Sequence, residues 1–163
     1  MHNWIVQAKV WYDAGVPGEH PQLELDRQVC FALHAASRAV VRAYGPLLDA
    51  AHLTYTQYLV LLVLWEAPDE PVSIGQLGER LQLDSGTLTP LCKRLEALGY
   101  IERRRDPADE RRVLVAATPS GLALQDELAD VPLTLAARLE LTPASAKELR
   151  ELLVALTAAL ETL

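Results

Sequence analysis

Apolar and polar positions repeat with a helical period over residues 23–51. Five apolar residues recur at intervals of three, four and seven: Val29, Leu33, Val40, Tyr44 and Leu47. Arginines lie between them, so the spacing predicts one long helix. Pro46 falls in its last third, where we expect it to bend or split the helix, because proline lacks an amide hydrogen and clashes with the preceding turn.

A continuous apolar segment follows Thr54. Thr54 and Gln57 have the form of a capping box, in which each side chain accepts a hydrogen bond from the backbone amide of the other residue. The run after them, residues 58–65, contains only apolar residues. A helix that is apolar on every face is buried on every face, so we expect a core helix that ends near Pro68.

Two short helices come next. Ser73 and Gln76 form a second capping box, which opens a helix through about Leu81. Asp84 and Ser85 offer the N-cap of another, which covers residues 85–98 and stops at Gly99. Helices joined by so short a turn form a helix-turn-helix.

Strand-like residues 100–105 and 112–117 flank the turn-forming residues 106–109, which predicts a hairpin with a charged tip. Two later positions, Thr118-Pro119 and Thr142-Pro143, each place a capping hydroxyl before a proline, so each starts a helix. The second of these helices extends to about Glu161. The predicted fold class is mainly α with a small β-hairpin wing: a winged helix-turn-helix flanked by long helices.

One compact chain is expected. A length of 163 residues leaves no room for a separate catalytic domain beside a regulatory one. We divide the chain into an extension of unknown role at 1–22, flanking helices at 23–53 and 118–163, and a winged helix-turn-helix at 54–117. The longest apolar run has eight residues, far short of the roughly 20 that a membrane span needs.

The charge and the cysteine content limit the cell compartments and the kinds of binding partner that are compatible with the sequence. The net charge is −7, but the stretch from Lys93 to Arg112 holds seven basic and five acidic residues. An acidic body with one cationic stretch is compatible with DNA binding, although it does not require it. Two cysteines in 163 residues are too few for a disulfide framework and fit a reducing compartment. We expect a cytoplasmic protein without membrane passage.

The second helix of a helix-turn-helix enters the major groove of DNA, and small hydroxyl residues near its start suit phosphate and base contacts. Residues of that kind and two later cations form the candidate set: Ser85, Gly86, Thr87, Thr89, Pro90, Lys93 and Arg94. Arginines at 103–105 and 111–112 of the hairpin suit a neighbouring minor groove. The alternative is that these are solvated charges.

Cys30 lies in the first long helix, where a free cysteine is ordinarily a small core residue. His34 is one turn away on the same face, so its imidazole could favour the thiolate that reacts with peroxide. Cys92 falls on the buried stripe of the predicted second helix of the helix-turn-helix, so we interpret it as packing. The chain has four histidines and no second ligand at zinc spacing, so we expect no metal and no cofactor.

Taken together, several segments resemble the organic-hydroperoxide-sensing repressors of the MarR family, over roughly residues 25–163. The matching strings are CFAL at 30–33, SR at 37–38, YGPLLD at 44–49, LTYTQYL at 53–59, LWE at 64–66, LDSGTLTPL at 83–91, KRLE at 93–96 and DER at 109–111. The cysteine together with LDSGTLTP is specific to this branch, whereas a winged helix alone indicates only the MarR family.

The resemblance implies a homodimer, held by the flanking helices, that represses transcription on double-stranded operator DNA and releases it when an organic hydroperoxide oxidises the cysteine. By matching position, Cys30 is the peroxidatic thiol, Tyr44 and Tyr55 bond its thiolate, and Arg111 is the wing arginine oriented by Asp109. On one helix, Cys30 and Tyr44 are about 21 Å apart, so they can meet only across a dimer interface.

The sequence departs from the family at two places. His34 stands where many relatives have a tyrosine, and no cysteine lies within 118–163 to resolve the sulfenic acid. A mixed disulfide with a low-molecular-weight thiol, further oxidation or a bridge to Cys92 therefore remain open. Two other functions also remain: a MarR-type repressor relieved by a small aromatic ligand with Cys30 inert, and a thiol peroxidase using Cys30 and His34.

Overall fold

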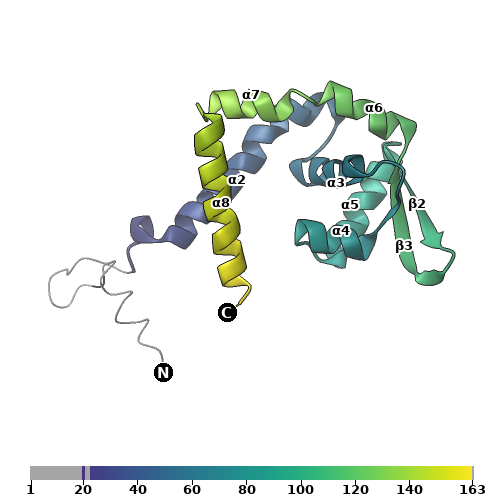
Figure 1. Ribbon diagram of the computed structural model, residues 1–163, viewed down its shortest axis with the longest axis horizontal. Coiled ribbons are helices and arrows are strands. Elements are labelled where there is room, and N and C mark those ends of the chain that lie inside the picture. Colours follow the sequence, from purple (N-terminus) through teal and green to yellow (C-terminus); the bar gives the residue numbers. More distant parts are fainter. Residues whose placement is uncertain (1–19, 21–22, 163) are drawn as a thin grey trace. The chain divides into compact units, whose positions relative to one another are not determined.

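The computed structural model describes residue 20 and residues 23–162 (Figure 1). The extension expected at 1–22 therefore lies outside the described residues, apart from His20. The chain divides into two compact units, residues 1–42 and residues 43–163. One long helix, α2 (Val29–Leu48), runs from the first unit into the second.

The first long helix is shorter than its sequence pattern predicts. A 3-10 turn, η2 (Leu25–Arg27), is followed by Gln28 in an extended conformation, and α2 begins only at Val29. Pro46 does not split the helix, which continues to Leu48 and gives way to a 3-10 turn, η3 (Asp49–Ala51). Pro46 has no amide hydrogen to donate to the carbonyl of residue 42, but only two residues of α2 follow it, so the helix ends soon after the proline and is not split into two.

The second unit is built around α3 (Tyr55–Glu66), which begins at the expected capping box. Thr54 N donates to Gln57 Oε1 at 2.8 Å, and Gln57 N donates to Thr54 Oγ1 at 3.4 Å. Six of its twelve residues are buried. The expectation of burial on every face is wrong on one side, however, because Leu62 is 36% exposed. An all-apolar helix thus faces solvent in part within the single chain.

The helix-turn-helix consists of α4 (Ile74–Leu81) and α5 (Ser85–Ala97). Ser73 and Gln76 form the expected capping box of α4, and Asp84 caps α5. The glycine at 99 has φ +79°, the left-handed conformation that ends a helix at little cost for a residue without Cβ. Leucines of α3, α4 and α5 are completely buried together: Leu61, Leu64, Leu77, Leu88 and Leu95.

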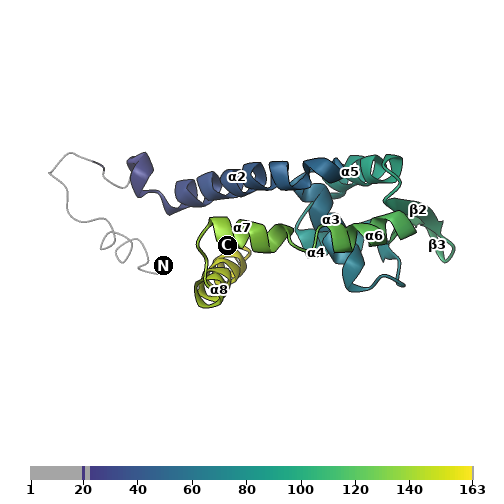
Figure 2. The ribbon, with the colours of Figure 1, turned by 90° about the horizontal axis from the view of Figure 1, so that it is seen from above.

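A three-stranded antiparallel sheet adjoins these helices, with the order β1-β3-β2. The hairpin of β2 (Ile101–Asp106) and β3 (Asp109–Ala117) is the expected wing, with a connection of two residues rather than four. It projects beyond the ends of α5 and α6 (Figure 2). Sequence reasoning missed β1 (Val72–Ser73), which pairs with Val115 and Leu114 of β3.

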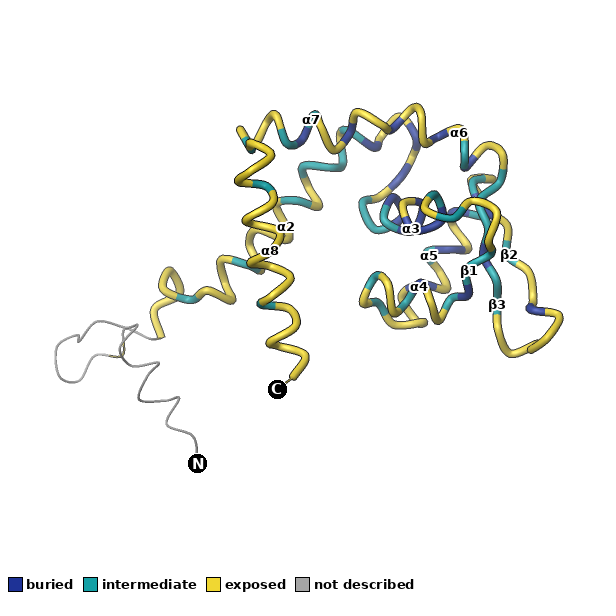
Figure 3. The backbone as a smooth tube through the Cα atoms, viewed as in Figure 1, coloured by how far each residue is buried: buried dark blue, intermediate teal, exposed yellow. Residues whose placement is uncertain are grey.

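Three helices follow the wing, where the sequence predicted two. The helix α6 (Pro119–Glu127) starts at Thr118 and α8 (Pro143–Leu160) starts at Thr142, each capped as expected. An unpredicted break separates α6 from α7 (Val131–Arg138). No residue of α8 is buried within the described chain, and its tube is almost wholly exposed in Figure 3.

Within the described residues, no single helix is both long enough and apolar enough to cross a membrane. The segments 29–51 and 55–66 meet that test only when they are joined across a bend. Half of the residues of α3 are buried in the core of the second unit, which accounts for its apolar composition.

Candidate nucleic-acid interface and thiol site

The start of α5 is held by Asp84. Its carboxylate accepts hydrogen bonds from Thr87 N at 2.9 Å and from Thr87 Oγ1 at 2.8 Å. These bonds from Thr87 lower the pKa of Asp84. A Cβ on Gly86 would lie 2.9 Å from Asp84 Oδ1, so the glycine leaves room for the capping carboxylate. The side chain of Thr87 is thereby fixed in orientation, and its hydroxyl proton is already donated to Asp84.

The remaining candidate residues of α5 lie on its exposed side. Ser85, Thr89, Pro90, Lys93 and Arg94 are all exposed, whereas the stripe of Leu88, Cys92 and Leu95 is completely buried. Thr89 Oγ1 donates to the carbonyl oxygen of Ser85 at 2.7 Å. Its oxygen can still accept a hydrogen bond from a partner.

A groove brings part of the predicted set together. It has a volume of about 350 Å³ and lies where the start of α4, the start of α5 and the wing meet. Ser85 and Thr89 line it from α5, and Arg111 and Arg112 line it from β3. Residues from α5 and the wing therefore face one common space.

The other predicted residues of α5 lie apart from that groove. Thr87, Pro90 and Arg94 line a second groove of about 320 Å³ that includes Thr54 and Thr56 at the start of α3. Lys93 lines neither groove. Sequence reasoning did not include Thr54, which was explained by its capping role, or Thr56, which has no capping role.

The wing arginines are not equivalent, contrary to the sequence expectation that treated them as one cationic group. Arg103 forms an ion pair with Glu96 at 2.7 Å, and Arg112 lies 3.4 Å from Asp106 Oδ2. Arg105 Nη1 donates to the carbonyl oxygen of Glu110 at 2.6 Å. Within the described part of the chain, Arg104, Arg105 and Arg111 form no ion pair, so no acidic side chain neutralises these three arginines of the wing.

Asp109 contacts Arg111, but through the backbone. Its Oδ1 accepts a hydrogen bond from Arg111 N at 3.0 Å. This contact fixes the turn into β3 rather than the guanidinium of Arg111 itself. The orientation of the Arg111 guanidinium by Asp109, which the resemblance implies, stays a prediction.

Cys30 is the second residue of α2 and is exposed. It is therefore not a core residue of the single chain, which removes the ordinary interpretation of a buried cysteine. His34, one turn later, is also exposed. No hydrogen bond between the two side chains is found among the described residues.

The two tyrosines assigned to the thiolate lie together in the second unit. The rings of Tyr44 and Tyr55 are 4.4 Å apart between centroids, and Tyr58 lies 5.9 Å from Tyr44. Burial raises the pKa of Tyr44, and the neighbouring phenols Tyr55 and Tyr58 raise it further. Burial likewise raises the pKa of Tyr55. All are therefore neutral hydrogen-bond donors at physiological pH.

Sequence reasoning missed two members of this aromatic cluster, Tyr58 and Trp65. Trp65 packs edge-on against Tyr58 with centroids 6.1 Å apart, so the cluster comprises Tyr44, Tyr55, Tyr58 and Trp65. Tyr58 lies three residues after Tyr55, and Trp65 lies seven residues after Tyr58, which places all three on one face of α3. That spacing was the available signal, but the wholly apolar segment concealed it.

Cys92 is completely buried, which confirms its interpretation as packing. Burial raises the pKa of its thiol to about 11. Among the described residues, no group of three or more histidine, cysteine or acidic side chains could hold a metal ion.

Comparison with known proteins places this geometry in a family. Residues 42–128 match the family described as "Transcriptional regulator SarA/Rot". The chain is 45% identical over 141 residues to the organic hydroperoxide resistance transcriptional regulator of Bacillus subtilis (strain 168), covering 86% of this chain and 92% of that protein. It belongs to the SarA/Rot/MarR-type family of winged-helix transcriptional regulators.

Solved structures agree with this membership. The structure of reduced AbfR bound to DNA has a TM-score of 0.74 and 31% identity, over 86% of this chain and 95% of that one. A crystal structure of MarR has a TM-score of 0.67 and 25% identity, over 81% of this chain and 96% of that one. This SarA/Rot/MarR-type chain is accordingly a transcriptional regulator and not an enzyme, so the thiol peroxidase alternative is set aside.

Proposed function

We propose that this SarA/Rot/MarR-type regulator is a dimeric, cytoplasmic repressor that binds operator DNA while Cys30 is reduced and releases it when an organic hydroperoxide oxidises Cys30. The observation that carries the proposal is the 4.4 Å contact between Tyr44 and Tyr55. These phenols come from different helices, and the resemblance assigns both to one thiolate. The Bacillus relative bears the name of an organic hydroperoxide regulator.

DNA binding is supported by the groove shared by α5 and the wing. Ser85 and Thr89 offer hydroxyl groups there, and Arg111 offers a cation. Hydroxyl and guanidinium groups are the usual partners of phosphates and guanine edges. The similar AbfR structure is of a protein bound to DNA. The recognition helix α5 and the wing would then contact neighbouring grooves of one duplex.

Dimer formation is supported by apolar side chains that the single chain leaves exposed. On α2 they include Val29, Phe31 and Val41, and on α8 they include Leu149, Leu152 and Leu160, all between 39% and 66% exposed. Such surfaces on helices indicate a protein interface. A second copy would also supply the phenols, since Tyr44 is about 21 Å along α2 from Cys30 of its own chain.

The chemistry requires a thiolate and a peroxide. The sulfur of Cys30 attacks the outer oxygen of the hydroperoxide, the O–O bond breaks, and the alcohol leaves with a proton, which oxidises the sulfur to sulfenic acid. A small thiol then displaces water from the sulfenic acid and forms a mixed disulfide. A bridge to Cys92 would require opening of the core, because that sulfur is completely buried. The bulk added at Cys30 would separate the two recognition helices.

The test uses a duplex selected from random sequences by the reduced wild-type protein. Wild type, Cys30→Ser and Cys92→Ser are compared in gel-shift titrations before and after cumene hydroperoxide. We expect peroxide to release wild type and Cys92→Ser but not Cys30→Ser. Release of Cys30→Ser from DNA by peroxide would contradict the proposal. So would a reduced wild-type protein that selects no duplex from the random sequences.

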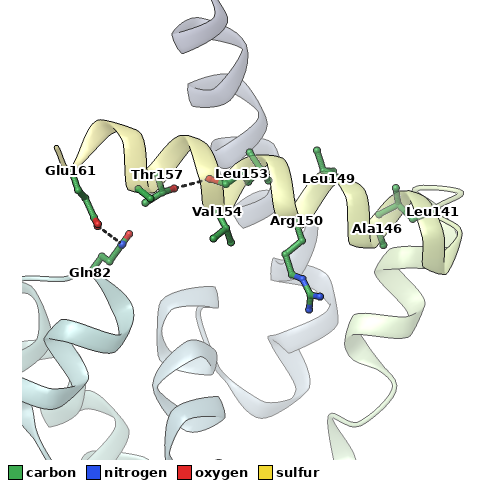
Figure 4. A pocket seen from close by; sticks show the side chains of 10 residues that line it. Gln82, Leu141, Ala146, Leu149, Arg150, Leu153, Val154, Thr157 and Glu161 are labelled. Carbon is green, nitrogen blue, oxygen red and sulfur yellow. Dashed lines mark hydrogen bonds between the residues drawn. The ribbon is translucent and has the colours of Figure 1, made fainter. Parts of the chain in front are cut away.

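A second candidate function is suggested by a pocket of about 520 Å³ between α8 and the end of α4. Apolar side chains of α8 line it together with Arg150, and Gln82 Nε2 donates to Glu161 Oε1 at 2.7 Å at one end (Figure 4). This size and composition suit a small aromatic acid. Release of Cys30→Ser from DNA by such a ligand, here salicylate, would favour this alternative.

A further inference from the structure

The recognition helix and the wing are joined by one charged pair. Glu96, in the last turn of α5, accepts three hydrogen bonds from Arg103 of β2. Glu96 Oε1 accepts from Arg103 N at 3.1 Å, and Glu96 Oε2 accepts from Nε at 3.0 Å and from Nη2 at 2.7 Å. We refer to Glu96 and Arg103 as the clamp.

The clamp is better defined than the other ion pairs of the described chain. Arg103 is 21% exposed and Glu96 is 38% exposed, whereas both partners of the Arg80–Glu66 pair are 57% exposed. The hydrogen bonds from Arg103 lower the pKa of the Glu96 carboxyl. Two guanidinium nitrogens, Nε and Nη2, donate to the one oxygen Oε2, while Oε1 accepts from the backbone of Arg103, so the orientation of the arginine is more restricted than in an ion pair with one hydrogen bond.

The clamp spans the connection between α5 and β2. Between α5 and β2 the chain passes through Gly99, which has φ +79° and no atom within 4 Å of where a Cβ would lie. Tyr100 N donates to the carbonyl oxygen of Leu95 at 3.1 Å and fixes the turn itself. Beyond that turn, Ile101 of β2 is buried in the same core as Leu95, and the clamp joins β2 to α5 two residues later through polar groups.

The groove described above depends on that direction. Ser85 and Thr89 lie on α5, whereas Arg111 and Arg112 lie on β3. That strand pairs with β2 at residues 113–117 and again at Asp109, so the two arginines lie in the irregular stretch between these paired parts. Arg103 itself pairs with Val115 in this ladder. Any rotation of the wing against α5 therefore changes the distance between the two sides of the groove.

We propose that Glu96 and Arg103 are positioning residues that hold the wing at the angle at which α5 and Arg111 reach one DNA duplex, and that Arg103 makes no contact with phosphate. The proposal rests on the DNA-binding function proposed above. Arg103 differs in this from Arg104, its neighbour on β2, which is exposed and has no ion pair in the described chain.

The test compares five variants by their affinity for the selected duplex, their affinity for a random duplex and the salt dependence of both. The variants are Arg103→Ala, Glu96→Ala, the double variant of the two, Arg104→Ala and Arg80→Ala. Arg80→Ala is the matched control, since it breaks an exposed arginine–glutamate pair between α3 and α4. Circular dichroism and melting identify any variant that does not fold.

For Arg103→Ala we expect the ratio of selected to random affinity to fall about tenfold, which is comparable to the loss of one base-pair contact. The slope of log K against log salt should not change, because no phosphate contact is lost. For Glu96→Ala the ratio should fall equally, while the slope steepens by about 0.9 because Arg103 is freed to meet a phosphate. The double variant should lose no more than either single variant, since both remove one interaction.

Arg104→Ala should show the opposite pattern: a slope about 0.9 shallower with the ratio kept within about twofold. Arg80→Ala should change neither quantity. The proposal is overturned if Arg103→Ala shows the pattern expected of Arg104→Ala, if the single losses add in the double variant, or if neither single variant changes the ratio. Failure of the wild type to bind any duplex would instead refute the proposed function.

Discussion

The carbonyl oxygen of Gly121 accepts a hydrogen bond from Trp65 Nε1 at 2.9 Å. This bond joins the start of α6 to the end of α3 and connects the aromatic cluster to the helix that follows the wing. On its other side, Gly121 lies so close to the carbonyl of Tyr100 that a Cβ would overlap that oxygen. Gly121 of α6 therefore contacts both the end of α3 and the base of the wing.

Gly121→Ala should destabilise the protein by roughly 1–3 kcal/mol, because the added methyl group must push α6 away from a backbone carbonyl that cannot rotate aside. Gly45→Ala in α2 is the matched control, since nothing lies within 4 Å of its Cβ position. It should be neutral or up to about 1 kcal/mol more stable. Urea unfolding at one fixed protein concentration measures both, and equal stabilities would refute the close approach at Gly121.

Thiol labelling should distinguish the two cysteines. In the folded protein at pH 7, iodoacetamide should modify Cys30, which is exposed, and leave Cys92 intact. With a pKa of about 11, the Cys92 thiol is ionised in only about one molecule in 10⁴ at that pH. Mass spectrometry of Cys30→Ser should show no native labelling and full labelling in urea. Rapid native labelling of that variant would show that the core around Cys92 opens.

Ionisation of the Cys92 thiol should lower the free energy of unfolding at alkaline pH. Its pKa is raised on folding, so the neutral thiol is favoured in the folded state, and the unfolded chain ionises first. The contribution of the neutral Cys92 thiol to the free energy of unfolding is complete below about pH 9. It is lost as the pH rises towards 11, and the loss reaches about 2–3 kcal/mol. The free energies of unfolding of wild type and Cys92→Ala should converge over that interval. Parallel curves would contradict the raised pKa.

The role of the phenol hydroxyls in the aromatic cluster can be tested separately from the role of its rings. Tyr44→Phe and Tyr55→Phe keep the 4.4 Å ring contact and remove the hydroxyl groups. We expect each to slow the oxidation of Cys30 by cumene hydroperoxide roughly tenfold, as loss of a hydrogen bond to a thiolate shifts its ionisation by about one pKa unit. Tyr58→Phe is the matched control and should keep the wild-type rate. A uniform effect of all three substitutions would mean that the phenols act only through packing.

Glu140→Gly should stabilise the protein. Glu140 follows α7 with φ +53°, a left-handed conformation in which every residue with a Cβ is strained. Glycine relieves that strain but loses more freedom on folding, so the net gain should be about 0.5 kcal/mol. Arg138→Gly, two residues earlier and inside α7, should cost about 1 kcal/mol instead. Thermal melting that ranks the two variants in the reverse order would contradict the assigned helix end.

The local signals in the sequence predicted helix starts well and helix partners poorly. Thr54, Ser73, Asp84, Thr118 and Thr142 all cap the helices expected of them, because a cap depends on residues within one turn. The strand β1 has only two residues, and its existence depends on a partner 43 positions away. No local pattern contains that information.

In the candidate site, too, features that depend on one helix could be predicted from the sequence, and features that depend on distant segments could not. The hydroxyl residues of α5 lie on its exposed face as its period predicts. The neutralisation of Arg103 by Glu96 could not be foreseen, because seven residues and a turn separate them and only the fold brings them together. The exposure of Cys30 was likewise hidden, since its neighbours are apolar but nothing in the described chain covers them.

The helix α8 has eighteen residues and buries none of them against its own chain. Isolated helices of this length are only marginally stable in water, so whatever covers its leucines also determines whether it persists. Dilution would then unwind the C-terminal end before the helix-turn-helix melts, and the amount of protein in the cell would set how much of it is helical there.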